Sequence, residues 1–311
     1  MKILLISLGC DKNLVDSEVM LGILSQNGHE ITNDETEAEV CIINTCAFIR
    51  DAQEESINTI IEMGRLKETG RLKKLIVTGC LSERYKDEIL SELPEIDTIL
   101  GAANYDAIAA AIYSDDRAIL SDKNYMPDGR LSRLVTTTAA MAYLKIAEGC
   151  SKFCTYCAIP YIRGAYRSVP MDDLIIQAER LAAEGIRELV LVAQETTIYG
   201  TDIYGEKKLP ELLKRLCLID GIEWIRLLYC YPEEITDELI DVMATEEKIC
   251  HYIDMPIQHS EDEILKRMGR KTCRSDLELV IRKLRERIPD IAIRTTLIAG
   301  FQERQMNIMR N

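Results

Sequence analysis

Residues 149–160 have the sequence GCSKFCTYCAIP, which contains three cysteines with three and then two residues between them. An apolar run, residues 141–146, precedes this segment, so we expect a loop at the end of a β-strand. Cysteine thiolates are the ligands of iron–sulfur clusters. The spacing therefore predicts that Cys150, Cys154 and Cys157 bind three irons of a 4Fe–4S cluster and leave the fourth iron open to a small molecule.

Two other interpretations of this segment compete with the cluster. Structural zinc sites use four protein ligands at paired spacings, and no fourth Cys or His follows nearby. A chance spacing is the second alternative in a chain with 11 cysteines. The strand pattern before the loop, and the flanking Gly149 and Pro160, favour a built site over chance.

Composition limits the class of protein. The chain has 311 residues, of which 47% are hydrophobic and 29% charged, so a globular protein of two domains is expected. Many cysteines without a signal peptide predict reduced thiols in the cytoplasm, and no apolar stretch approaches the length of a membrane span. A formal charge of −14 disfavours stable nucleic-acid binding and favours a basic partner.

The first part of the chain alternates between apolar strand patterns and helical patterns. Such alternation predicts an α/β fold with an open, doubly wound parallel sheet. We expect strands at residues 2–7, 40–44 and 74–78, with helices at residues 15–26, around 54–67, and from residue 82.

Three further cysteines follow the predicted strands of this part. Cys10, Cys46 and Cys80 each lie one to three residues beyond a strand. The carboxyl ends of parallel strands form the crevice where such sheets bind ligands, so these cysteines are predicted to converge on a second iron–sulfur cluster. Chance coincidence with the strand ends is the alternative. Cys41 lies within a strand and is expected in the core.

The second part of the chain repeats the alternation five times. This pattern predicts an incomplete (β/α) barrel, in which the chemistry belongs at the carboxyl ends of the strands. We expect the side chains there to line a cofactor pocket, although each one singly also suits a solvated loop; they are Tyr156, Gln194, Glu195, Gln258 and Thr295. A basic run, residues 266–274, is expected to be a solvated helix end.

The strand and helix patterns weaken between residues 113 and 138, where turn-forming residues gather. We therefore expect an α/β domain at residues 1–115, a linker at residues 116–138 and the partial barrel at residues 139–311, with the boundary near residue 135.

At this point the sequence resembles a known family. Two three-cysteine sets, one across an α/β domain and one on a barrel loop, are similar to those of the radical S-adenosylmethionine methylthiotransferases. The similarity covers nearly all of residues 1–300. It is carried by residues 7–18 (SLGCDKNLVDSE), 143–150 (YLKIAEGC), 192–197 (VAQETT) and 252–259 (YIDMPIQH), which resemble the branch that modifies a ribosomal protein.

The resemblance implies an activity and its cofactors. It implies two 4Fe–4S clusters and S-adenosylmethionine, with electrons from a donor such as flavodoxin or ferredoxin. The cluster on Cys150, Cys154 and Cys157 would generate a radical, and the second cluster would present sulfur. The substrate would be the β-carbon of an aspartate in ribosomal protein uS12. A transfer RNA adenosine methylthiotransferase and an inactive cluster-binding fragment are the alternatives.

The end of the chain departs from the family pattern. Residues 300–306 read GFQERQM, where relatives continue Gly-Phe-Pro-Gly-Glu-Thr, then a sixth barrel unit and a C-terminal β-barrel called TRAM. We therefore expect a chain truncated at its C-terminus, without the TRAM domain, whose activity is in question.

Overall fold

A computed structural model describes residues 1–137 and 140–301. The chain divides into two compact units. The first is Met1–Thr136 together with Tyr161–Gly164, and the second is Thr137–Pro160 together with Ala165–Asn311. The divergent end noted above, residues 302–311, lies outside the described residues.

The first unit contains a six-stranded sheet in the order β2-β1-β3-β4-β5-β6, and all neighbouring strands pair in parallel. The chain leaves β1 toward one edge and β3 toward the other, so the topological switch point lies between these two strands. This is the open parallel sheet that the sequence predicts. Its strands are β1 (Lys2–Ser7), β2 (Glu30–Ile31), β3 (Val40–Thr45), β4 (Lys74–Gly79), β5 (Thr98–Leu100) and β6 (Ala118–Ile119).

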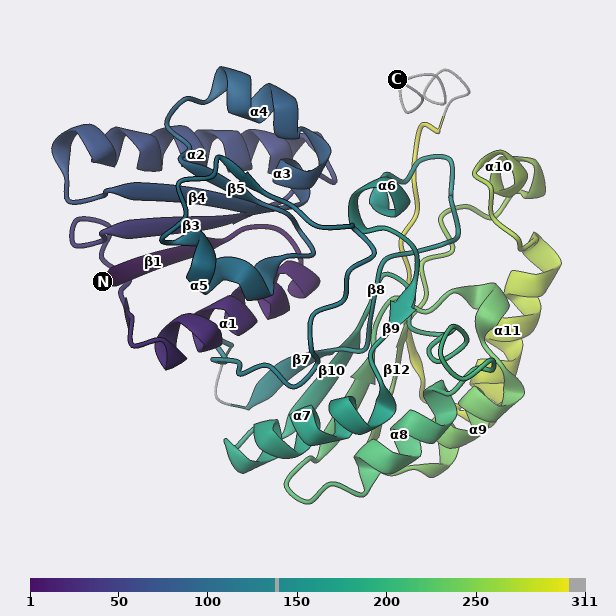
Figure 1. Cartoon of the computed structure of the whole chain (residues 1–311). Helices are drawn as coiled ribbons and strands as arrows, with labels where there is room; N and C mark the ends of the chain where they lie inside the picture. Colours follow the sequence, from purple (N-terminus) through teal and green to yellow (C-terminus); the bar gives the residue numbers. More distant parts are fainter. Residues whose placement is uncertain (138–139, 302–311) are drawn as a thin grey trace. The chain divides into compact units, whose positions relative to one another are not determined.

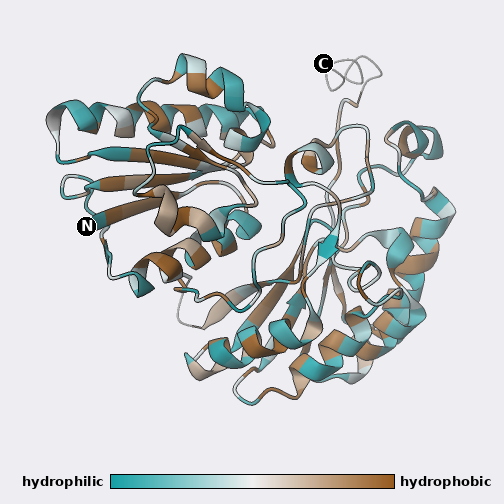
Figure 2. Cartoon of the chain, in the orientation of Figure 1, coloured by the Kyte–Doolittle hydropathy of each residue, from teal (hydrophilic) through white to brown (hydrophobic). Residues whose placement is uncertain are grey.

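Helices cover both faces of this sheet. Figure 1 shows α1 and α5 on one face and α2, α3 and α4 on the other. Every residue of β3 is buried, and the central strands appear as apolar bands in Figure 2, as expected for a parallel sheet covered on both sides. The helices are α1 (Asp11–Gln26), α2 (Arg50–Thr69), α3 (Cys80–Arg84), α4 (Lys86–Glu92) and α5 (Ile108–Ala111), preceded by the short 3₁₀ helix η1 (Tyr105–Ala107).

The second unit contains a five-stranded parallel sheet in the order β13-β12-β11-β10-β7. Spatial order follows chain order, as in a (β/α) barrel. Because β7 and β13 form the two ends of the sheet, the barrel is incomplete within the described residues, as predicted. The strands are β7 (Met141–Lys145), β10 (Glu188–Val192), β11 (Trp224–Leu227), β12 (Ile249–Asp254) and β13 (Ala292–Arg294).

Within the described residues, five α-helices and one 3₁₀ helix accompany the barrel strands, and the cysteine loop lies in the connection between two short antiparallel strands. These two strands are β8 (Ala147–Glu148) and β9 (Arg167–Ser168). A short helix, α6 (Ile159–Arg163), follows the loop. The remaining helices are α7 (Met171–Ala183), α8 (Leu209–Cys217), the 3₁₀ helix η2 (Pro232–Glu234), α9 (Asp237–Thr245), α10 (Asp262–Arg267) and α11 (Arg274–Arg287).

One helix begins earlier than the sequence pattern indicates. Helix α1 starts at Asp11 rather than near Val15. Its first turns carry Lys12, Asn13 and Asp16, which are polar but only 7%, 1% and 2% exposed. Hydrophobic periodicity cannot detect a buried polar face, and this face belongs to the candidate site described below.

The expected linker, residues 116–138, is bound to the first unit over most of its length. Strand β6 extends the sheet, and Glu18, which is fully buried in α1, accepts hydrogen bonds from Arg133 Nε (2.7 Å) and the Thr136 amide (2.6 Å). Gly22 of α1 packs against the same segment, because a Cβ there would lie 2.4 Å from the Ser132 carbonyl oxygen. Because of these contacts, the segment is packed against the first unit and is not a free linker.

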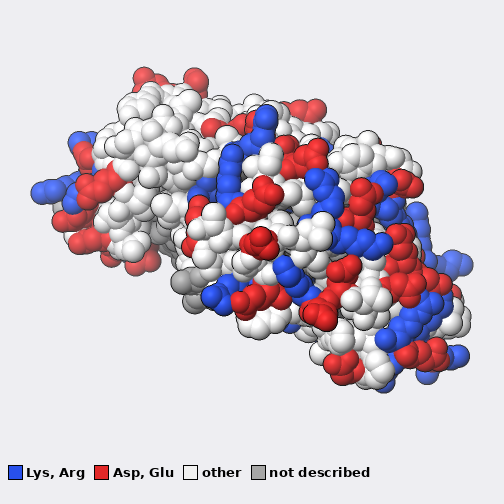
Figure 3. Space-filling view, turned by 90° about the horizontal axis from the view of Figure 1, so that it is seen from below, with Lys and Arg blue, Asp and Glu red and all other residues white. Residues whose placement is uncertain are grey.

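The surface carries both signs of charge. Figure 3 shows acidic and basic side chains interspersed over one face. Among the helices of residues 1–137 and 140–301, none combines the length and the apolar character that crossing a bilayer requires.

Candidate functional site

The structure brings Cys10, Cys46 and Cys80 together at one end of the first sheet. These residues follow β1, β3 and β4, which are adjacent strands whose carboxyl ends share an edge. The Sγ atoms of Cys10 and Cys80 lie 4.0 and 3.9 Å from the same atom, Asn13 Oδ1. A Cβ built on Gly9 would lie 3.1 Å from Cys46 Sγ, so the third cysteine borders the Gly9–Cys10 turn.

Glycines let the backbone approach closely at this site. Gly9 and Gly79 precede Cys10 and Cys80 with φ of +97° and +95°, a region that residues with a Cβ rarely adopt. A Cβ at Gly9 would lie 2.8 Å from Cys46 Cβ, and one at Gly79 would lie 2.4 Å from Asn44 Oδ1. These close approaches allow three thiols to gather at one edge of the sheet, and three is the number of protein ligands that a cubane with one open iron requires.

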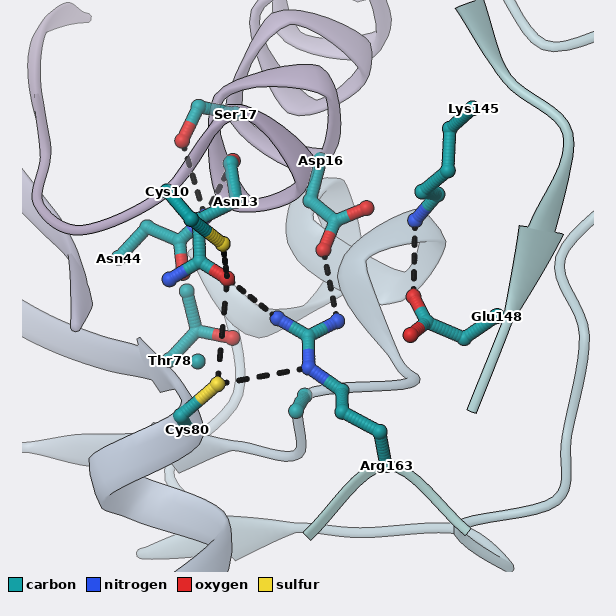
Figure 4. A network of polar contacts seen from close by, with 12 residues as sticks. Cys10, Asn13, Asp16, Ser17, Asn44, Thr78, Cys80, Lys145, Glu148 and Arg163 are labelled. Carbon is teal, nitrogen blue, oxygen red and sulfur yellow. Dashed lines mark hydrogen bonds and ion pairs between the residues drawn. The ribbon is translucent and has the colours of Figure 1, made fainter. Parts of the chain in front are cut away.

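A buried network of amides holds the three strand ends in register (Figure 4). Asn13 Nδ2 donates to the Thr45 carbonyl at 2.9 Å. Asn44 Nδ2 donates to the Asn13 carbonyl and to Ser17 Oγ, both at 2.9 Å. Because buried polar groups must be hydrogen-bonded, this network fixes α1 against β3 and so positions the cysteine in front of α1.

Arg163 lies among these cysteines, and sequence analysis did not identify it. It belongs to the segment Tyr161–Gly164, which groups with the first unit, and its Nε donates to Cys80 Sγ at 3.4 Å. Burial raises the pKa of the Cys80 thiol, and the Arg163 charge opposes that rise. Nothing in the local pattern of residues 159–163 shows that this arginine reaches a cysteine 83 residues away.

The second cysteine set forms a compact loop after β8. The Cys157 amide donates to the Cys154 carbonyl at 3.0 Å. The pKa values of Cys150 and Cys157 are raised to about 11 and 12, mainly by burial and to a smaller extent by the negative charge of Cys154. The three sulfurs are therefore close enough to repel one another as thiolates, which a bound cation would relieve.

Contacts with other segments of the second unit hold this loop at Cys154 and Thr155. Thr155 donates its amide to the Met268 carbonyl and its hydroxyl to the Arg267 carbonyl, each at 3.0 Å. Tyr231 Oη lies 3.9 Å from Cys154 Sγ. The cysteines are thereby held in place by α10 and by the segment that follows β11.

The two cysteine sets are not arranged around single ions. Among the residues that the structure describes, no three Cys, His, Asp or Glu side chains converge as the ligands of one metal ion do. The thiolates of a 4Fe–4S cluster each bind a different iron and stand further apart, whereas structural zinc requires four ligands around one ion. The donor chemistry of both sets fits the cluster.

Two predicted pocket residues, Gln194 and Glu195, follow β10 and carry unsatisfied buried atoms. Gln194 Nε2 donates to Glu148 Oε1 at 2.6 Å, and Glu148 in turn binds Lys145 at 2.9 Å. Within the described residues, Gln194 Oε1 and Glu195 Oε2 have no hydrogen-bond partner. Buried polar atoms are rarely left unpaired, and a polar ligand at the predicted pocket would satisfy these two.

The Glu195 carboxyl is fully buried, and its pKa is raised. Burial raises its pKa to about 8, although hydrogen bonds from Thr197 and the charge of Lys152 act in the opposite direction. Lys152 Nζ is 3.9 Å from Glu195 Oε2 but forms a closer ion pair with Glu234. Because Lys152 is already neutralised, burial dominates at Glu195.

Arg270 corrects one expectation from the sequence. The basic run of residues 266–274 was expected to be solvated, but Arg270 is only 6% exposed. Gly269, with φ of +72°, ends α10 and turns the chain inward. The guanidinium lies 4.1 Å from the ring centre of Tyr231, and its Nε has no hydrogen-bond partner in the described part of the chain.

The other predicted pocket residues have mixed surroundings. Tyr156 is partly buried, and burial raises its pKa above the ordinary value. The Gln258 amide donates to the Thr296 carbonyl at 2.9 Å. Thr295 Oγ1 donates to the Met255 carbonyl at 2.9 Å and accepts from the Ile257 amide at 3.2 Å, so it joins β13 to the end of β12. A cofactor contact by these three, as by Gln194 and Glu195, stays a prediction.

Backbone strain gathers at the same end of the barrel. Among the described residues, positive φ outside glycine occurs at Phe153, Tyr229 and Gln258, with values of 51°, 59° and 68°. Phe153 lies in the cysteine loop, and the other two follow β11 and β12. Strained conformations cluster at functional sites, where the surrounding structure holds them, so these residues support a ligand site at this end of the strands.

Family models match both units. Residues 2–101 match "Uncharacterized protein family UPF0004", and residues 144–310 match "Radical SAM superfamily". A relative from Lachnoclostridium phytofermentans, named "Ribosomal protein uS12 methylthiotransferase RimO", is 59% identical over 308 residues, which are 97% of this chain and 69% of the relative. A relative of the same name from Acetivibrio thermocellus is 52% identical over 311 residues, covering 96% of this chain and 68% of the relative.

The chain belongs to the radical S-adenosylmethionine methylthiotransferase family. The resemblance noted in its sequence is thereby confirmed. As a member of this family it is an iron–sulfur enzyme of the radical S-adenosylmethionine type, with 4Fe–4S and S-adenosylmethionine as its cofactors.

Solved structures support the fold of this methylthiotransferase. The radical S-adenosylmethionine methyltransferase TsrM from Kitasatospora setae matches with a TM-score of 0.65 and 15% identity over 95% of this chain and 67% of that chain. The cobalamin-dependent S-adenosylmethionine radical enzyme OxsB matches with a TM-score of 0.64 and 12% identity, covering 96% of this chain and 49% of that one. At these identities the likeness concerns the fold alone.

The close approach at Gly9 generates a testable prediction. We expect Gly9→Ala to displace Cys46, because the added Cβ would overlap its side chain, and to lower the iron retained by the first unit after anaerobic reconstitution. Gly28→Ala is the matched control: Gly28 also has positive φ, +77°, but a Cβ there meets nothing within 4 Å. An equal iron content in the two variants would show that the close approach of Gly9 to Cys46 is not needed for a metal site.

The raised pKa of Glu195 predicts that the stability of the apo-protein depends on pH. The folded pKa, about 8, exceeds the ordinary value of 4.5. Its stabilising contribution is therefore present below pH 4.5 and is lost as the pH rises toward 8. Between those limits we expect the free energy of unfolding of the unmodified protein to fall relative to Glu195→Gln by on the order of 4 kcal/mol. Urea unfolding at several pH values measures this difference, and parallel pH profiles would refute the shift.

Proposed function

We propose that this methylthiotransferase replaces one hydrogen on the β-carbon of an aspartate of ribosomal protein uS12 by a methylthio group. The observation that carries the proposal is one three-cysteine set in each unit: the first lies at the carboxyl ends of parallel strands, and the second lies on the loop that follows β7 and β8. Both sets occur in a chain that is 59% identical to a relative named as a uS12 methylthiotransferase.

The two cysteine sets would bind separate clusters. Cys150, Cys154 and Cys157 would hold a 4Fe–4S cluster whose open iron takes S-adenosylmethionine, and Cys10, Cys46 and Cys80 would hold a second one. When bound, the first cluster supplies the electron that cleaves S-adenosylmethionine to methionine and a 5′-deoxyadenosyl radical, which removes hydrogen from an unactivated C–H bond. Cofactors carry this chemistry, and the protein contributes binding, orientation and electrostatics.

Side chains of the second unit would orient S-adenosylmethionine. Gln194 Oε1, which has no hydrogen-bond partner among the described residues, offers an acceptor suited to an ammonium group. Glu195 Oε2 accepts no hydrogen bond there either, but it lies 3.9 Å from Lys152 Nζ. Arg270 presents a buried positive charge with an unpaired Nε–H, suited to a carboxylate. Burial raises the pKa of Tyr231, so its hydroxyl keeps its proton and can donate to the Cys154 sulfur.

Charge supports a protein substrate over RNA. The net charge of −14 attracts a basic ribosomal protein and repels a polyanion. The face shown in Figure 3 mixes both signs rather than presenting a continuous basic surface. We further propose a cytoplasmic location, where thiols stay reduced, and a flavodoxin or ferredoxin as the electron donor.

The test of this function is mass spectrometry of uS12. Expressed in cells whose own uS12 is unmodified, the chain is expected to increase the mass of uS12 by one methylthio group less one hydrogen, located at a single aspartate. Cys154→Ser should abolish the modification, because it removes a proposed cluster ligand. Cys217→Ser is the control, since Cys217 lies in α8, away from the strand ends.

The same cells distinguish the alternatives. A methylthio group that appears on adenosine of transfer RNA while uS12 stays unmodified would replace this proposal by the transfer RNA activity. Modification of uS12 by the Cys154→Ser variant would show that the assigned cysteine is not needed.

A further inference from the structure

Arg163 is a buried charge with three contacts that lead toward the first cysteine set. The residue is 4% exposed. Its Nη1 donates to Asp16 Oδ2 at 2.9 Å, its Nη2 donates to Asn13 Oδ1 at 2.5 Å, and its Nε donates to Cys80 Sγ at 3.4 Å (Figure 4). The three donor nitrogens thus face three different acceptors.

These contacts fix the orientation of the guanidinium. The Asp16 carboxylate is 2% exposed, so it forms a desolvated ion pair with Arg163. Asn13 is held independently, because its Nδ2 is bound to the Thr45 and Leu8 carbonyls. Because a guanidinium is planar, binding two of its nitrogens fixes the direction in which the third donates. Here the third nitrogen directs its Nε–H at the Cys80 sulfur.

A buried ion pair does not by itself explain this arrangement. Replacing such pairs by apolar residues is often neutral or stabilising, so a buried pair is weak evidence of a stabilising role. Asn13 Oδ1, which accepts from Arg163, also lies 4.0 Å from Cys10 Sγ and 3.9 Å from Cys80 Sγ. Arg163 therefore places positive charge directly beside the Cys80 thiol, which the proposed function assigns to the cluster.

We propose that Arg163 is a positioning residue of the first cysteine set, where its Nε–H donates to the Cys80 sulfur and favours the reduced state of the cluster held there. This inference rests on the proposed assignment of Cys10, Cys46 and Cys80 as cluster ligands. Adding one electron increases the negative charge on the iron and sulfur atoms. A donor N–H and a positive charge at a ligand sulfur stabilise that added charge, so they raise the reduction potential.

The experiment uses the full chain carrying Cys150→Ala, Cys154→Ala and Cys157→Ala, so that only the first cysteine set can hold a cluster. After anaerobic reconstitution, the cluster is titrated with dithionite, which supplies one electron, and followed by electron paramagnetic resonance. With Arg163→Met, we expect iron content to be unchanged. At a fixed potential the ratio of reduced to oxidised cluster should fall about tenfold, equivalent to 59 mV for one electron.

Two further variants test whether a change in the reduction potential is only a consequence of a less stable fold. Arg163→Met leaves Asp16 buried without its partner, which can destabilise the fold. The double variant Asp16→Asn with Arg163→Gln removes both charges, and the same direction of shift is expected because the charged donor at the sulfur is lost. Arg133→Met is the matched control: Arg133 pairs with buried Glu18, which lies on the opposite side of α1 from Asp16, so stability should fall while the potential stays the same.

The outcomes separate this inference from the proposed function. A lower potential in both Arg163 variants, but not in Arg133→Met, supports the inference. An unchanged potential, or loss of iron from both Arg163 variants, overturns it. Absence of iron from the Arg163-containing parent overturns the assignment of Cys10, Cys46 and Cys80, and the inference falls with it at that earlier step.

Discussion

The close approach of backbone to cysteine at the carboxyl ends of parallel strands is the constraint on which the rest of the structure depends. A parallel strand ends with its last groups facing a crevice, but a thiol reaches that crevice only if the chain turns sharply. Glycine supplies the turn before Cys10, Cys80 and Cys150, with φ of +97°, +95° and +77°. The same Gly-Cys step thus occurs in both units, although their sheets differ in strand order.

Holding polar groups at such an edge requires buried hydrogen bonds. In the first unit, Asn13 and Asn44 tie α1 to the strand ends, and both are only 1% exposed. In the second unit, Thr155 joins the cysteine loop to α10. Near the second site, Gln194, Glu195 and Arg270 each carry a buried polar atom without a hydrogen-bond partner among the described residues, as do Tyr166 and Thr272. Hydrogen-bonded polar groups therefore hold the strand ends and the cysteine loop in place. Polar groups without a hydrogen-bond partner indicate where we expect a ligand.

The sequence was sufficient for the fold class, because the longer strands and helices leave local apolar patterns. The assignment of the six cysteines as cluster ligands stays a prediction. Strands β5 and β6 have three and two residues, too few to show a pattern. Arg163 and Arg270 were missed for a different reason: their roles depend on burial beside residues distant in the sequence. The three Gly-Cys pairs were a signal in the sequence that could have linked the two sites. The roles assigned to the five pocket residues stay predictions; these residues are Tyr156, Gln194, Glu195, Gln258 and Thr295.

The central claim is that each unit holds its own 4Fe–4S cluster on three cysteines. The most direct measurement is the iron and acid-labile sulfide content, with Mössbauer spectra, of the anaerobically reconstituted chain and of two variants that replace one cysteine set each by alanine. The account predicts about eight irons in the unmodified chain and about four in each variant, all in 4Fe–4S form. About four irons in the unmodified chain, with none lost on replacing Cys10, Cys46 and Cys80, would contradict it.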